Sequence, residues 1–191
     1  MNAGTWRRVW LGALLLAALS PRPAAGVPVP PALRGWLEAL DSAPTPAQVR
    51  RAGGDQVATL LDGVARDGKE IAFVRNRAIG LLSQLDDAAS EKKLRRLLQL
   101  SAPAQRATAA LAWLAGPLAR HPSWVSATLP TLLADPAAGV RAAAARGLRY
   151  VADRRLARAL AVAQRARESD VAVRSALDAA IVQIDAPQGK R

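Results

Sequence analysis

Four copies of one apolar pattern recur along this chain of 191 residues and constrain its fold more than any other feature. Each copy has small or aliphatic residues at offsets 0, 3, 4 and 7, a spacing that places them on one face of an α-helix. The copies are Ala78-Leu81-Leu82-Leu85, Ala107-Ala110-Leu111-Leu114, Ala144-Gly147-Leu148-Val151 and Leu177-Ala180-Ile181-Ile184. Their starting positions differ by 29, 37 and 33 residues, so each copy is expected to be one helix of a repeating unit.

Segments with apolar helical stripes of their own lie between the copies. They cover residues 56–66, 91–100, 124–134 and 154–167. Pairs of helices that repeat about every 33 residues are typical of an α-solenoid. We therefore expect an all-α fold, a right-handed α-solenoid of about four helix pairs over residues 55–185. Its inner helices are predicted near 70–86, 103–118, 138–152 and 170–184.

The residues on either side of the repeats have a different character. Residues 27–54 are rich in proline and contain one short stripe at 32–40, which predicts an N-terminal cap helix. Thr45 and Pro46 are typical of a helix start, and Gly53 and Gly54 would end that helix. Residues 186–191 form a polar tail.

Composition excludes several kinds of chemistry. The chain has no cysteine and one histidine, which removes disulfides, thiolate nucleophiles, iron–sulfur clusters and two-histidine metal sites. Hydrophobic residues make up 51% of the chain but aromatic residues only 4%, which favours close helix packing over a β-sandwich. We expect no cofactor and no metal.

The first 26 residues have the pattern of a signal peptide. Arg7 and Arg8 precede an apolar run at 9–19, and small residues at Ala24 and Gly26 fit a cleavage site. A helix of 11 residues is about 16 Å long, against the ~30 Å core of a bilayer, so it would not anchor the chain. An amphipathic surface helix fits less well, because the run has no polar face. We expect a periplasmic or secreted protein.

The export route stays open. Arg7-Arg8-Val9-Trp10-Leu11 resembles the twin-arginine export motif, although Trp6 stands where that motif has a polar residue. The general secretory route with a basic start is the alternative. Frequent alanine and arginine are typical of a GC-rich bacterial gene.

The third copy and its flanks resemble a HEAT repeat. The matching features are Leu129-Pro130 in the outer helix, the Asp135-Pro136 turn and Val140-Arg141 at the start of the inner helix. The resemblance covers residues 55–185 in four units. The second unit lacks both the Val-Arg pair and the turn aspartate, so its boundaries are open.

This resemblance implies a shape and partner binding but no particular chemistry. It also implies that turn aspartates and inner-helix arginines pair between units. The matching residues are Asp67, Asp135 and Asp170 with Arg75, Arg141 and Arg174. Chromophore-attaching lyases and some DNA glycosylases use related repeats, but nothing in this sequence beyond the fold supports either activity. Cytosolic DNA repair also conflicts with an export signal.

Charge points to an anionic partner or to a solvated surface. Without residues 1–26 the chain keeps a formal net charge of +9. An arginine cluster contributes much of this charge: Arg141, Arg146, Arg149, Arg154, Arg155, Arg158, Arg165 and Arg167. Such a density attracts anionic polymers or lipid head groups. The alternative explanation of this arginine density is that the arginines occupy solvated helix faces.

A row of four side chains provides the second candidate surface. Gln84, Trp113, Tyr150 and Gln183 each lie six positions after the start of a copy, so stacked helices would place them side by side. With Arg106, Arg146 and Arg149 they are predicted to bind a partner protein segment or a glycan, because arginine and aromatic residues dominate interface energetics. Packing between helices is the alternative use of the same row.

No combination of residues in the sequence predicts catalysis. His121 lies between two helices with no orienting carboxylate nearby, and Ser101, Ser123 and Ser126 lie in no nucleophile motif. The Asp86-Asp87 pair is expected to lie in a solvated turn. We expect a monomeric, non-enzymatic interaction scaffold with no small-molecule substrate, which binds a protein segment along its inner helices. Binding of anionic polymers through the arginine cluster is the alternative.

Overall fold

The structure is a computed structural model that describes residues 28–41, 43–100, 102–116 and 122–186, with the side chains of residues 122–125 excepted. Throughout these residues the chain is helical and contains no strand, which confirms the all-α prediction. The helices are α1 (Pro31–Glu38), α2 (Pro46–Gly53), α3 (Val57–Arg66), α4 (Ala72–Ser83), α5 (Ala88–Leu97), α6 (Pro103–Ala115), α7 (Pro122–Leu133), α8 (Ala138–Gly147), α9 (Arg154–Arg167) and α10 (Val171–Asp185). Short 3-10 turns cover Gly54–Gln56 and Leu148–Tyr150. The predicted signal peptide lies outside the described residues.

Polar side chains define where several helices begin. Thr45 and Gln48 form a reciprocal capping box at the start of α2, and Gly54 ends that helix at a φ of 58°. Asp87 accepts a hydrogen bond from the backbone N–H of Ser90 at the start of α5. Asp153 and Asp170 cap α9 and α10 in the same way. The helix predicted from Thr45 to Gly53 is therefore confirmed.

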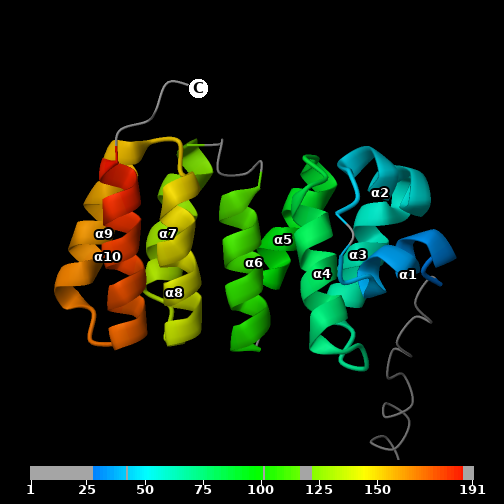
Figure 1. The fold of residues 1–191 in the computed structure, drawn as a ribbon, viewed down its shortest axis with the longest axis horizontal. Coiled ribbons are helices and arrows are strands. Elements are labelled where there is room, and N and C mark those ends of the chain that lie inside the picture. The colour runs from blue at the N-terminus through cyan, green and yellow to red at the C-terminus, as the bar shows by residue number, and fades with distance from the viewer. Residues whose placement is uncertain (1–27, 42, 101, 117–121, 187–191) are drawn as a thin grey trace, which may run out of the picture.

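Helices α4, α6, α8 and α10 correspond to the predicted inner helices, a name that we keep for them, and they contact one another in chain order (Figure 1). Helices α3, α5, α7 and α9 each contact the inner helix that follows them. One continuous core runs between the two layers and is built mainly from leucine, alanine and valine. Helix α1 contacts α4, and α2 contacts α3, at the N-terminal end of the molecule.

Two glycines permit close approach between successive inner helices. A Cβ atom at Gly147 of α8 would lie 2.3 Å from Cδ1 of Leu114 in α6. One at Gly116, just after α6, would lie 2.8 Å from the carbonyl oxygen of Ser83 in α4. Neither contact leaves room for a side chain, because real Cβ atoms are not found at such distances from other heavy atoms. The small residue predicted at Gly147 therefore brings α6 and α8 together.

The second sequence copy has a different register from the one predicted. Arg106 donates through Nη1 to the carbonyl oxygen of Leu100, as Arg75 does to Glu70 and Arg141 to Asp135. Each of these arginines lies three residues before a fully buried alanine, so the second copy starts at Ala109 and not at Ala107. The spacings become 31, 35 and 33 residues.

This shift changes which residues are equivalent. Trp113 now corresponds to Leu82 and Leu148, both of which are buried in the core. Ala115, which is exposed, becomes the counterpart of Tyr150. In the corrected register the row is Gln84, Ala115, Tyr150 and Gln183, and Trp113 is not part of it.

Candidate partner-binding surface

Arg106 lies in an ion pair at the start of α6. Its Nη2 atom is 3.0 Å from Oδ1 of Asp135, and the two side chains are 13% and 15% exposed. The pair joins α6 to the turn that precedes α8. The structure thus places Arg106 between neighbouring helix pairs and not on a surface beside Trp113, where the sequence predicted it.

Arg141 forms the equivalent link one helix pair further along. Its Nε and Nη2 atoms lie 2.8 and 2.9 Å from the two carboxylate oxygens of Glu168. Glu168 also accepts from the side chain of Gln164 and from the backbone N–H of Asp170, and its side chain is 3% exposed. The hydrogen bonds from Arg141 lower the pKa of Glu168 to about 2, against burial, which raises it.

The pairing between turn acids and inner-helix arginines differs from the one that the HEAT resemblance implied. Asp135 pairs with Arg106 of α6, the preceding inner helix, and Arg141 pairs with Glu168. Asp170 caps α10, and Asp67 accepts a hydrogen bond from the backbone N–H of Lys69. Glu168 was missed because it lies two residues before the turn aspartate that the pattern selects.

The side chains of the predicted row differ in exposure. Trp113 is 1% exposed and lies in the core, so it presents no surface to a partner. Tyr150 is 42% exposed, and Gln84 and Gln183 are also exposed. The exposed members lie where α4, the turn after α8, and α10 end. We call this side of the molecule the C-terminal edge of the inner helices.

Tyr150 and Gln183 line one hollow at this edge, which we call the Tyr150 hollow. Its volume is about 220 Å³, and its other lining residues are Arg149, Val151, Ala152, Arg154 and Ile184. The Arg149 guanidinium lies 4.6 Å from the centre of the Tyr150 ring and donates through Nη2 to the tyrosine oxygen at 2.6 Å. Three of the predicted site residues therefore meet here, together with Arg154, which the sequence marked only as a member of the arginine cluster.

A second, larger hollow lies at the same edge around Gln84. It has a volume of about 710 Å³ and is lined by Pro46, Arg50, Ser83, Gln84, Leu85, Asp86, Ala115 and Gly116. Arg50 lies 2.9 Å from Asp87, whose side chain also caps α5. Burial raises the pKa of Asp87, but hydrogen bonds from Ser90 and Arg50 outweigh it and lower the pKa overall. This hollow therefore combines both signs of charge, unlike the Tyr150 hollow.

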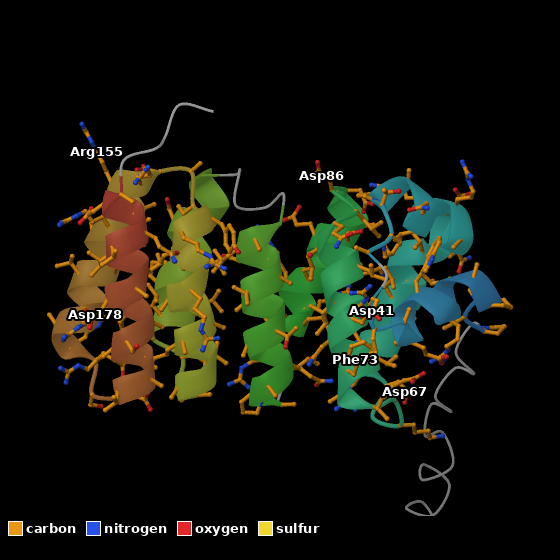
Figure 2. All side chains as sticks on the ribbon, in the orientation of Figure 1. Asp41, Asp67, Phe73, Asp86, Arg155 and Asp178 are labelled. Carbon is orange, nitrogen blue, oxygen red and sulfur yellow. The ribbon has the colours of Figure 1, made fainter. Side chains whose placement is uncertain are left out.

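The arginine cluster is divided among several structural contacts. Arg141, Arg158 and Arg165 pair with Glu168, Asp185 and Asp178. Arg154 and Arg167 donate to the Ala186 carbonyl oxygen and the Gln164 side chain. Arg146 and Arg155 are exposed, and neither forms an ion pair with any residue that the structure describes. Figure 2 shows Arg155 pointing outward at the C-terminal edge, on the same side as Asp86.

The structure describes only some of the residues that the sequence considered for catalysis. His121 and Ser101 lie outside the described residues, as does the side chain of Ser123. Asp87 caps a helix, and Asp86 lies in the preceding turn with a φ of 47°. Within the described part of the chain, no group of three histidine, cysteine or acidic residues is placed to hold a metal ion.

The remaining observations concern the chain as a whole. Among the described helices, none is both long and apolar enough to cross a membrane. No protein-family model matches the sequence, and no curated protein matches it.

Proposed function

We propose that this protein is a non-enzymatic scaffold that binds a segment of a partner protein along the C-terminal edge of its inner helices. The observation that carries the proposal is the Tyr150 hollow. There, the exposed ring of Tyr150, the guanidinium groups of Arg149 and Arg154 and the amide of Gln183 line one concave surface. They come from the turn after α8, the start of α9 and the end of α10. Arginine and tyrosine are enriched at the energetic centres of protein interfaces.

The proposal includes an α-solenoid of the HEAT type as the scaffold. Contacts between successive inner helices support it, as do the links from Arg106 to Asp135 and from Arg141 to Glu168. In a solenoid each unit packs only on its neighbours, and the last unit needs a polar outer face. At α10, Asp178 takes the place of the buried Ala145 and pairs with Arg165, which gives the end of the stack a polar surface.

We further propose that the scaffold acts in the periplasm or outside the cell, as a monomer, after removal of residues 1–26. The signal-peptide pattern of the sequence supports this location. Intact-mass analysis of the protein from its native source tests it. A mass that includes residues 1–26 would contradict export with cleavage.

Binding of anionic polymers through the arginine cluster has less support. Three of its eight arginines already neutralise carboxylates, which leaves fewer charges for a polymer. Contacts with many phosphates or sulfates would weaken about a thousandfold or more between about 50 and about 200 mM salt. Binding centred on Tyr150 should change far less over that range, so the salt dependence separates the two functions.

The direct test is selection of binders from a library of random peptides displayed on phage, followed by affinity measurements on purified peptides. We expect Tyr150→Ala to weaken binding by at least about tenfold, or roughly 1.4 kcal/mol. Phe73→Ala is the matched control, because Phe73 is a similarly exposed aromatic at 38% and lies toward the opposite edge (Figure 2). Peptides that bind the wild-type protein and Tyr150→Ala equally well, or the absence of any selected peptide, would refute the proposal.

A further inference from the structure

The Tyr150 hollow is rich in hydrogen-bond donors. Each guanidinium carries about five N–H groups. Arg149 uses one for the Tyr150 oxygen, and Arg154 uses one for the carbonyl oxygen of Ala186. Because the tyrosine oxygen accepts from Arg149, its own O–H is directed toward a different acceptor. A ligand that fills this hollow must therefore supply acceptor oxygens.

The charge around the hollow is positive and largely uncompensated. Arg146 lies one helical turn before Tyr150, is exposed, and has no ion-pair partner among the described residues. No acidic residue lines the hollow, and two acids close to its lining residues in the chain have other contacts, since Asp153 caps α9 and Asp185 pairs with Arg158. Forked guanidinium groups match the two oxygens of a carboxylate better than a single-point acceptor.

The partial negative charge at the carboxyl ends of helices disfavours an anion in this hollow, and a hydrogen bond from Arg154 partly offsets that effect. The hollow lies beside the carboxyl ends of the Leu148–Tyr150 turn and of α10, where backbone carbonyl groups carry partial negative charge. Arg154 covers one of these groups by donating to the oxygen of Ala186 at 2.8 Å. Arg149 and Arg154, which both line the hollow, keep further N–H donors for a ligand.

The size of the hollow limits the group that it encloses. A volume of about 220 Å³ corresponds to roughly seven waters at about 30 Å³ each. That space suits the side chain of an aspartate or glutamate, whose methylene groups would contact Val151 and Ile184. A polysaccharide chain would extend well beyond it.

From these observations we propose that the Tyr150 hollow recognises an aspartate or glutamate side chain in the bound segment, held by Arg149 and Arg154. This inference rests on the proposed function, because it names the residue type that anchors the partner segment. Tyr150 would pack against the segment next to the acid, while Gln183 would hydrogen-bond to its backbone.

The test uses the peptides selected from the random library. We expect each to carry an acidic residue whose change from Glu to Gln, or from Asp to Asn, weakens binding at least about tenfold. Arg149→Ala should cause a similar loss with an unchanged melting temperature. Arg155→Ala is the control, because it removes the same charge from an exposed arginine that does not line the hollow. Equal losses of peptide affinity in the two arginine variants would show that the effect comes from net charge alone and would overturn the inference.

Two further results distinguish this inference from the proposed function. Peptides that need Tyr150 but tolerate loss of their acidic residue would leave the scaffold function standing and refute carboxylate recognition. Inorganic phosphate, added at constant ionic strength, tests whether the hollow selects carboxylates. We expect phosphate to compete only weakly with the peptides. If phosphate displaces the peptides at concentrations where acetate has no effect, the hollow is a phosphate site and the proposal is overturned. If no peptide is selected at all, both proposals fail together.

Discussion

Arginines lie near both ends of α8, and the two ends differ in how these side chains are used. Arg141, near the start, pairs with Glu168, whose side chain is 3% exposed, and so links α8 to the turn before α10. Arg149, just after the end, stacks on an exposed tyrosine beside an open hollow. A buried guanidinium needs a paired carboxylate, because an unpaired charge in the interior is costly. An arginine in contact with water needs none, so its donors remain available to a ligand.

The same contrast separates the two aromatic residues that the sequence placed in one row. Trp113 of α6 lies between helices and has a buried Nε1 that makes no hydrogen bond with the described residues. Tyr150 lies at the surface. The first therefore stabilises the fold, and the second is free to bind. We call buried positions such as Trp113 sealed and exposed positions such as Tyr150 open, and changes at the two kinds of position should differ in their effect on stability.

The largest effect is expected at Trp113. Trp113→Ala should lower the free energy of unfolding by about 3–5 kcal/mol, because it leaves a large cavity in the core. Tyr150→Ala should change it by less than about 0.5 kcal/mol, as is usual for exposed positions. Urea denaturation monitored by circular dichroism measures both. Trp113→Phe is the control, since it keeps an aromatic ring in the core and should cost less than the alanine variant, and the ring N–H that it also removes has no hydrogen-bond partner among the described residues. Equal stability of the alanine variants would refute the division between sealed and open positions.

The next largest effect is expected at the ion pair. Glu168→Gln should destabilise the protein by about 3 kcal/mol, because Arg141, whose side chain is only 16% exposed, would lose the carboxylate that balances its charge. Asp178→Asn removes the partner of Arg165 at an exposed site and should cost less than about 1 kcal/mol. The comparison of the two variants by urea denaturation isolates burial as the cause. If both variants lower the free energy of unfolding by the same small amount, the ion pair of Arg141 and Glu168 is not a sealed contact.

A smaller and graded effect is expected from acid. The pKa of Glu168 is lowered from 4.5 to about 2, so its contribution to stability is complete above about pH 4.5 and is lost as the pH falls toward 2. The difference in unfolding free energy between the wild type and Glu168→Gln should shrink over this range. Denaturation curves at several pH values between 7 and 2 measure it. A difference that stays constant with pH would show that the Glu168 carboxylate does not keep its low pKa.

Much of the helical structure could be predicted from local sequence patterns. The segment predicted at 154–167 is α9 without a change of boundary, and Thr45 with Gly53 bounded α2 correctly. The error in α6 has a specific origin. Alanine occurs at 102, 104, 107, 109, 110, 112 and 115. Several registers of the apolar stripe therefore fit equally well, because a small apolar residue occurs on nearly every face of this helix.

The candidate site was predictable only in part. Tyr150 and Gln183 were selected from their offsets in the repeats and Arg149 because it flanks Tyr150, and the structure brings all three to one hollow. Arg154 joins them through the turn between α8 and α9, and the conformation of that turn could not be predicted from the apolar stripe. Arg106 was assigned to the surface because its partner, Asp135, lies 29 residues away in the chain.

The sequence by itself determined where the helices lie and which of their faces are apolar, because the backbone hydrogen bonds of a helix join residues only a few positions apart. Only the tertiary structure decided which arginines are sealed and which remain open. That choice depends on contacts between residues about 30 positions apart, such as Arg141 with Glu168, and on the register in which α6 packs against α8. Residue type and spacing are the same for a paired and an unpaired arginine, so the distinction appears only when the neighbouring helix is in place.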